Sequence, residues 1–290
     1  MSSDEASAAQ RADHVDEPLL AELERFFDAV PRNAAVVEKY GPLTLFVRQG
    51  AGWPFYARPT LGNVTEARAS DVKRVRARQR ELGVPEAFEW VAETHPRLGA
   101  TLRAMGFVVR EVPLMAHDAA SGQPNTRPPL DARTVRVLGP DDPALPWALA
   151  LPHVVFGAQH DGLARQHDVA AAVRERASDG SLERVAQRIA SGLTSVVAAL
   201  SKGGDVLCSG QRHQVGAVSE IVAMATLPHA RRQGLGTAVT DALVNDAYLR
   251  RASTVFLSAE SEDVARLYAR SGFRRAGTAA MAEPPAVMSD

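Results

Sequence analysis

The stretch of sequence that decides the fold is Glu220-Ile-Val-Ala-Met-Ala-Thr-Leu-Pro-His-Ala-Arg-Arg-Gln-Gly-Leu-Gly-Thr237. Its first seven residues predict a strand, because apolar and β-branched residues predominate. Pro228 ends that strand, since a proline cannot donate to a central ladder. A basic turn with Gly234 and Gly236 then leads into a helix that is apolar on one face. The stretch therefore predicts a strand, a glycine-bearing turn and an amphipathic helix.

The start of that helix is suited to an anionic group. Its first turn has free backbone N–H groups and the positive end of the helix dipole, and Gly234 and Gly236 have no Cβ to keep a ligand away. These properties predict a pyrophosphate site. A P-loop is excluded because Thr237, not lysine, follows Gly236. A dinucleotide fingerprint is excluded because Val239 stands where a third small residue is required.

A second block follows at a fixed distance. Residues 254–258 (Thr-Val-Phe-Leu-Ser) predict a strand, and Val264 to Ser271 predict a short helix. Gly272 is placed to close that helix in a left-handed conformation, with Phe273 packing back.

The two blocks together resemble the GCN5-related N-acetyltransferase (GNAT) superfamily. Residues 231–236 (Arg-Arg-Gln-Gly-Leu-Gly) resemble its Arg/Gln-x-x-Gly-x-Gly/Ala signature, and the second block resembles its Asn-x-x-Ala-x-x-Leu-Tyr-x-x-x-Gly-Phe motif. The second match is inexact, with Ser261 where Asn is common and Val264 where Ala is. The resemblance implies an α/β (α+β) fold of two GNAT-like domains, each a central mixed, largely antiparallel twisted sheet flanked by helices.

The resemblance also implies acetyl-CoA as the acyl donor, with no metal. In the family, the strand before the turn separates from its neighbour and pairs with the pantetheine arm, which corresponds here to Met224, Ala225 and Thr226. The other cofactor-binding positions that the resemblance implies are Arg231, Arg232, Gln233, Gly234, Leu235, Gly236, Thr237 and Ser261.

Two residues are candidates for proton transfer. When an amine displaces acetyl from a thioester, the departing thiolate requires a proton, and the phenol of Tyr268 is protonated at neutral pH and can supply it. The amine arrives as ammonium and must lose a proton, for which Glu220 is the candidate base, directly or through water. The alternatives are that Tyr268 is a core aromatic residue and that Glu220 is a solvated charge.

The N-terminal half contains a fainter copy of the same pattern. Gly106-Phe107 echoes Gly272-Phe273 at a separation of 166 residues, which indicates a tandem GNAT arrangement. Leu102 stands in the first copy where Tyr268 stands in the second, so we interpret the first copy as degenerate.

The resulting domain prediction has four parts. Residues 1–16 form a disordered tail, 17–117 the degenerate GNAT-like domain, 118–132 a Pro-rich linker and 133–290 the catalytic GNAT domain.

The composition restricts the class of protein. The chain has 290 residues, 46% hydrophobic and 23% charged, which is typical of a folded globular protein. The formal charge of −1 gives no global basic field for nucleic acid. Cys208, the one cysteine, excludes an internal disulfide and is expected to be a buried strand thiol. Neither a signal peptide nor a membrane span is predicted, so we expect a cytoplasmic location. The oligomeric state is left open between a monomer and a homodimer.

The sequence thus predicts an N-acetyltransferase that moves acetyl from acetyl-CoA to a primary amine of a small molecule by direct attack. Two alternatives stay open. One is an acyltransferase of this fold with another donor, either a longer acyl-CoA or an aminoacyl-tRNA. The other is a CoA-binding sensor or scaffold without catalysis.

Overall fold

The computed structural model describes residues 16–50, 55–118, 134–157, 166–178 and 180–285. Their contacts divide into two compact units. The first unit contains residues 16–49, 55–114 and 275–285, and the second contains residue 50 and the described residues from 115 to 274. Apart from Asp16 and Asp118, the predicted tail and the predicted linker lie outside the described residues.

The first unit is a mixed sheet with helices. Its elements are α2 (Glu17–Arg32), β1 (Ala35–Tyr40), β2 (Leu43–Arg48), β3 (Ala57–Pro59), α3 (Ala69–Glu81), β4 (Phe88–Val91), α4 (Leu98–Ala104), β5 (Val108–His117) and β11 (Phe273–Glu283). The spatial order of its strands is β1-β2-β3-β4-β11-β5. The pairs β1/β2 and β2/β3 are antiparallel, whereas β3 and β4 are parallel.

The last strand of the chain pairs within this first unit. In β11, Ala280 lies opposite Trp90 of β4 in an antiparallel ladder. The predicted second domain runs to residue 290, whereas the contacts group residues 275–285 with the N-terminal unit. The division falls within β5 and β11, so each of these strands contributes residues to both units.

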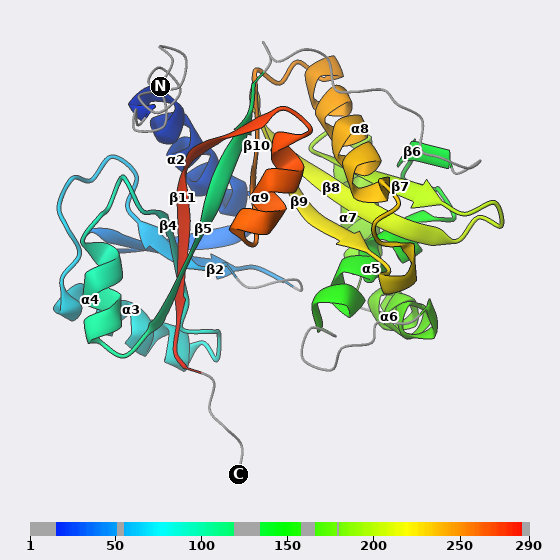
Figure 1. Cartoon of the computed structure of the whole chain (residues 1–290). Helices are drawn as coiled ribbons and strands as arrows, with labels where there is room; N and C mark the ends of the chain where they lie inside the picture. Colours follow the sequence, from blue (N-terminus) through cyan, green and yellow to red (C-terminus); the bar gives the residue numbers. More distant parts are fainter. Residues whose placement is uncertain (1–15, 51–54, 119–133, 158–165, 179, 286–290) are drawn as a thin grey trace, which may run out of the picture. The chain divides into compact units, whose positions relative to one another are not determined.

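The second unit contains the sequence blocks discussed above (Figure 1). Its elements are β6 (Thr134–Leu138), α5 (Leu145–Gly157), α6 (Gln166–Ser178), α7 (Ser181–Ala190), β7 (Thr194–Leu200), β8 (Val206–Val215), β9 (Val218–Thr226), α8 (Leu235–Leu249), β10 (Thr254–Ser258) and α9 (Glu262–Ala269). The strand order is β10-β9-β8-β7-β6. β6 to β9 are antiparallel neighbours, and β9 and β10 are parallel.

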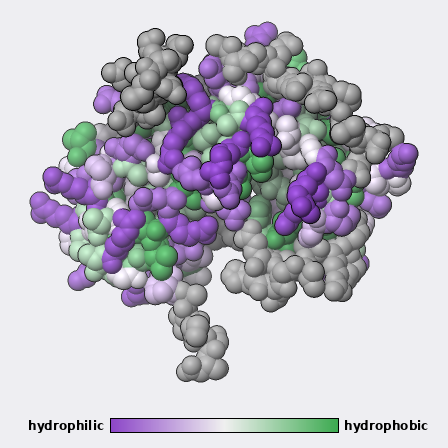
Figure 2. All heavy atoms as spheres, viewed as in Figure 1, coloured by the Kyte–Doolittle hydropathy of each residue, from purple (hydrophilic) through white to green (hydrophobic). Residues whose placement is uncertain are grey.

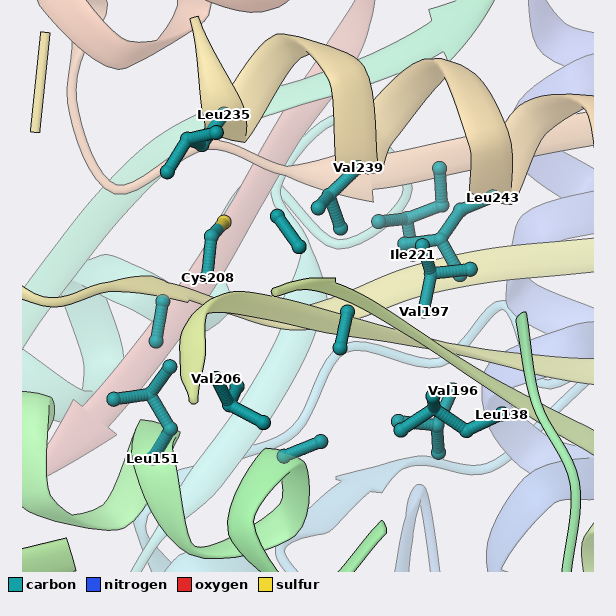
Figure 3. Packing of buried hydrophobic residues seen from close by; sticks show 14 of the residues in the cluster. Leu138, Leu151, Val196, Val197, Val206, Cys208, Ile221, Leu235, Val239 and Leu243 are labelled. Atoms are coloured by element: carbon teal, nitrogen blue, oxygen red, sulfur yellow. The ribbon is translucent and has the colours of Figure 1, made fainter. Parts of the chain in front are cut away.

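The core of the second unit has one layer on each face of this sheet. Figure 3 shows Val239 and Leu243 of α8 meeting Ile221 and Val197 on one face, and Leu151 of α5 on the other. All five side chains are almost fully buried. Complete burial on both faces explains why β7 is apolar throughout most of its length instead of alternating.

The repeat predicted from Gly106 and Gly272 extends to whole elements. The starts of α3 and α8 are 166 residues apart, and so are the starts of β4 and β10. Gly106 and Gly272 both have left-handed φ angles, +85° and +83°, and each precedes a buried phenylalanine. The helices and the mixture of parallel and antiparallel strand pairs confirm the predicted α/β fold class.

The surface seen in Figure 2 is largely hydrophilic, and the helices are too short or too polar to cross a membrane in the part of the chain that is described. Figure 2 shows hydrophilic residues spread over the visible faces of both units, interspersed with smaller hydrophobic areas. Within the part of the chain that the structure describes, no helix is both long and apolar enough to cross a bilayer.

Candidate active site

Strand β9 carries a β-bulge at its centre. Ser209 of β8 pairs with Ala225 and Gln211 pairs with Val222, so three steps on β9 correspond to two steps on β8. The extra residue places Ala223 at a φ of +54°, a left-handed angle that is uncommon for a residue with a side chain. Bulges of this kind bend a strand and redirect its side chains and backbone groups.

The same strand separates from β10. Only three residue pairs join these two parallel strands, and the last is Phe256 with Glu220. β9 continues to Thr226, so its second half faces no β10 partner in this ladder. The backbone separation expected from the family resemblance is therefore present, and it leaves N–H and C=O groups of β9 available to a ligand.

The turn after β9 leads to a helix start that no side chain caps. Gly234 is the N-cap of α8, with a φ of +76° and no side-chain hydrogen bond at the cap. A Cβ at Gly236 would meet nothing within 4 Å, so the approach to this helix start is open. Arg232 also has a left-handed φ of +60°, and its side chain is exposed. The uncapped N–H groups and the arginine make this turn suited to a diphosphate.

Helix α9 positions Tyr268. Ser261 is the N-cap of α9, where its Oγ accepts a hydrogen bond from the backbone N–H of Val264 at 3.4 Å. The ring of Tyr268 packs edge-on against Phe273, with ring centroids 5.9 Å apart. Burial above all, and then the neighbouring Cys208 and Glu260, raise the pKa of Tyr268 to about 12. The phenol is therefore a proton donor at neutral pH.

A cavity of about 770 Å³ connects these features. It is lined by the half-buried side chain of Tyr268, the second half of β9 and the start of α8. Of the predicted site residues, the lining includes Met224, Ala225, Thr226, Arg231, Arg232, Gly234, Leu235, Gly236, Thr237 and Tyr268. Phe156 in the last turn of α5 also lines it, so the cavity extends to the C-terminal end of this helix.

Three predicted site residues do not line this cavity. Gln233 lines a separate hollow of about 430 Å³ beside Lys202 and His229. Ser261 caps α9, as described above. Glu220 lies at the point where β9 and β10 separate, in register with His213 on β8.

Glu220 projects from the face of the sheet opposite α8. On β8, Arg212 bonds to Asp246 of α8, while Ser209 bonds to the backbone of Ala148 in α5. Because side chains alternate along a strand, His213 lies on the α5 face, and its register partner Glu220 lies there too.

Six further lining residues are not among the predicted site residues. They are Thr240, Glu260, Val264, Leu267, Arg270 and Ser271. Arg270 adds a third cation to the lining, two residues after Tyr268. Helical periodicity could have indicated Thr240, which lies one turn after Gly236 and donates a hydrogen bond to its carbonyl oxygen at 2.9 Å.

Two alternative chemistries receive no support from the described residues. Cys208 is fully buried and accepts a hydrogen bond from Thr226 at 3.1 Å, and burial raises its thiol pKa to about 11, so it is not an activated nucleophile. Within the described ranges, no group of three or more His, Cys, Asp or Glu side chains could hold a metal ion.

The bulged strand, the local separation of two parallel strands and the uncapped helix start agree with the arrangement that the family resemblance implies. Residues 196–273 match the family model "Acetyltransferase (GNAT) family". The second unit therefore contains a GNAT-family domain, and the matched range covers both sequence blocks.

Solved structures give the same fold. A GCN5-related N-acetyltransferase from Kribbella flavida is 18% identical, with a TM-score of 0.67 over 92% of this chain and 96% of its own. A GCN5-related N-acetyltransferase-like protein from Streptococcus suis is 12% identical, with a TM-score of 0.54 over 91% and 97%. A tandem GNAT protein from the clavulanic acid biosynthesis pathway is 16% identical, with a TM-score of 0.53 over 86% and 79%. No curated protein matches this chain.

Proposed function

We propose that the second unit transfers an acetyl group from acetyl-CoA to a primary amine of a small molecule. The observation that carries this proposal is the single cavity joining the uncapped start of α8 to the phenol of Tyr268. Its volume of about 770 Å³ falls within the range typical of ligand and cofactor sites.

The positive charges at one end of the cavity set the orientation of the bound cofactor. The diphosphate binds the N–H groups at the start of α8, beside Arg231 and Arg232. The pantetheine arm follows the open edge of β9 from Thr226 to Met224, and the thioester lies beside Tyr268.

The reaction is a direct acyl transfer. The amine nitrogen attacks the thioester carbonyl carbon, an N–C bond forms and the C–S bond breaks. Tyr268 donates its proton to the departing thiolate. The proton lost by the amine passes to Glu220 through water, since Glu220 does not line the cavity itself. Backbone N–H groups of the bulged strand stabilise the oxyanion that develops on the carbonyl oxygen.

Thermal unfolding with and without acetyl-CoA tests the first part of this proposal. At about 100 times its dissociation constant, acetyl-CoA should stabilise the protein by roughly 2.7 kcal/mol. Folded protein that shows no shift with acetyl-CoA contradicts the proposal.

Thiol release from acetyl-CoA in the presence of amine pools tests the second part, with mass spectrometry to identify the acetylated product. Binding of acetyl-CoA without thiol release from any pool would instead favour a CoA-binding sensor. Faster release from a longer acyl-CoA would identify another donor.

A further inference from the structure

Three polar residues form a row across the α5 face of the second unit's sheet. Thr194 of β7 is the register partner of His213 of β8, and His213 is the register partner of Glu220 of β9. Register partners place their side chains on the same face. The row ends at Glu220, the last residue of β9 that pairs with β10.

Arg188 lies at the other end of this row. It belongs to the last turn of α7, and its Nε donates a hydrogen bond to Oγ1 of Thr194 at 3.1 Å. Among the described residues, no carboxylate forms an ion pair with it. Desolvation by burial lowers the pKa of Arg188, and its positive charge in turn helps to lower the pKa of His213. A half-buried cation without a counter-charge is costly, and such groups occur preferentially at functional sites.

The intervening histidine does not compensate that charge. Burial first, and then the charges of Arg188 and Arg212, lower the pKa of His213, which leaves it neutral at physiological pH. Arg212 is satisfied separately, since it bonds to Asp246 on the other face of the sheet. The row therefore has a positive end at Arg188, a neutral centre and a carboxylate at Glu220.

The spacing of the two charged ends follows from the sheet. Neighbouring strands lie about 4.8 Å apart, so the backbones at Thr194 and Glu220 are separated by ~10 Å. Because the side chains of Arg188 and Glu220 extend from the backbone, the distance that a ligand must span is shorter than this backbone separation. A ligand that engages both has its charged groups several bonds apart.

We infer that this row binds the acetyl acceptor, with the amine linked to Glu220 through water and a carboxylate of the same molecule at Arg188. The acceptor class is then an amino acid whose reacting amine is several carbons from its carboxylate. Arg188 forms the anion subsite, because a guanidinium presents paired donors to a carboxylate. This inference rests on the proposed acetyl transfer, since it assigns the acceptor of that same reaction.

A matched series of amines tests the inference. The series pairs glycine, 4-aminobutanoate and 6-aminohexanoate with methylamine, propylamine and pentylamine, which lack the carboxylate, and thiol release from acetyl-CoA gives kcat/KM for each. We expect each longer amino acid to exceed its alkylamine by roughly tenfold to a hundredfold, and glycine to show no such advantage.

The variants Arg188→Gln and Arg188→Lys assign the preference to this side chain. Arg188→Gln should raise KM for the longer amino acids and leave the alkylamines unchanged, while Arg188→Lys should restore part of the preference. The matched control is Arg184→Gln, one turn earlier on α7, where the side chain is exposed and the preference should stay. Circular dichroism and the acetyl-CoA thermal shift establish that each variant is folded and binds the donor.

The inference is overturned if the amino acids are no better than their alkylamines, inactivity of both included, or if Arg188→Gln keeps the preference. A normal acetyl-CoA thermal shift in the same samples shows that the acceptor assignment has failed while donor binding holds. Loss of that shift in the wild-type protein contradicts the proposed function instead.

Discussion

Gly210 on β8 lies against the side chain of Met224 on β9, so closely that a Cβ at this glycine would overlap the methionine sulfur. It would also come within 2.9 Å of Leu243 on α8. The glycine has an ordinary φ angle, so it is the contact, and not the backbone conformation, that requires it. Met224 lines the cavity and lies beside the bulge. The absence of a side chain at Gly210 therefore allows Met224 to keep its position in the cavity wall.

Replacing this glycine should therefore affect both stability and cofactor binding. We expect Gly210→Ala to lower the free energy of unfolding by about 1–3 kcal/mol through overpacking, and to reduce the thermal shift with acetyl-CoA because Met224 is displaced. Gly203→Ala is the control, since a Cβ there makes only ordinary contacts, the nearest at 3.6 Å. Equal effects of the two substitutions, measured by urea unfolding, would refute this role of Gly210.

Removing the phenol hydroxyl should separate catalysis from binding. We expect Tyr268→Phe to lower kcat about a hundredfold or more, because the thiolate loses its proton donor, while the acetyl-CoA thermal shift stays unchanged. Tyr248→Phe is the matched control. Its hydroxyl lies 2.7 Å from Nδ1 of His117, outside the cavity lining, so its loss should reduce stability without changing kcat. Full activity of Tyr268→Phe would exclude Tyr268 as the proton donor.

The raised pKa of Tyr268 predicts a stability difference at alkaline pH. The folded value is about 12 against an ordinary value of 10.0, so the neutral phenol is favoured in the folded state. This contribution is complete below about pH 10 and is lost as the pH rises toward 12. Urea unfolding from pH 8 to 11 should show that the wild-type protein loses stability relative to Tyr268→Phe only above about pH 10. A parallel pH dependence of both proteins contradicts the assignment.

Two arginines with the same strained backbone provide a test of the diphosphate site. Arg232 and Arg251 have φ angles of +60° and +64°, and only Arg232 lines the cavity. Replacing either with glycine relieves left-handed strain, so each variant should be as stable as the wild type or up to about 1 kcal/mol more stable. Only Arg232→Gly should weaken acetyl-CoA binding, by about tenfold, as measured by calorimetry. Equal affinity in both variants would remove Arg232 from the site.

The buried ion pair below α8 predicts a large loss of stability. Nε of Arg212 lies 2.6 Å from Oδ2 of Asp246, and the arginine side chain has no exposed surface. We expect Asp246→Asn to lower the free energy of unfolding by about 3–5 kcal/mol, because an uncompensated charge stays buried. Asp263→Asn breaks an exposed pair with Arg266 and should cost less than about 1 kcal/mol. Chemical denaturation of both variants measures the contrast.

Local sequence was sufficient for the parts of the site that depend on local backbone conformation. The glycine-bearing turn at Gly234, the helix after it and the closure at Gly272 follow from glycine positions and apolar periodicity, and the structure confirms all three. The family resemblance, which rests on the motifs around these glycines, named ten of the residues that line the cavity.

The remaining features depend on pairing between distant segments. The bulge at Ala223 is a property of the register between β8 and β9, and the pairing of β11 with β4 joins residues that are 190 positions apart, Ala280 and Trp90. No periodicity of apolar residues within either segment indicates the bulge or the pairing. Arg188 belongs to the row only because three strands align it with Glu220, so its helix alone gives no reason to select it.

The short ladder of three residue pairs between β9 and β10 bears on how far the sequence of this fold can diverge. Past Glu220, the groups that β9 offers to a ligand are peptide N–H and C=O groups, and every residue type except proline supplies both. Substitutions in this half of the strand can therefore alter the walls of the cavity while preserving its main-chain contacts. A strand that offers main-chain groups in this way tolerates extensive sequence drift, in keeping with a fold shared by proteins that have fewer than one residue in five in common with this chain.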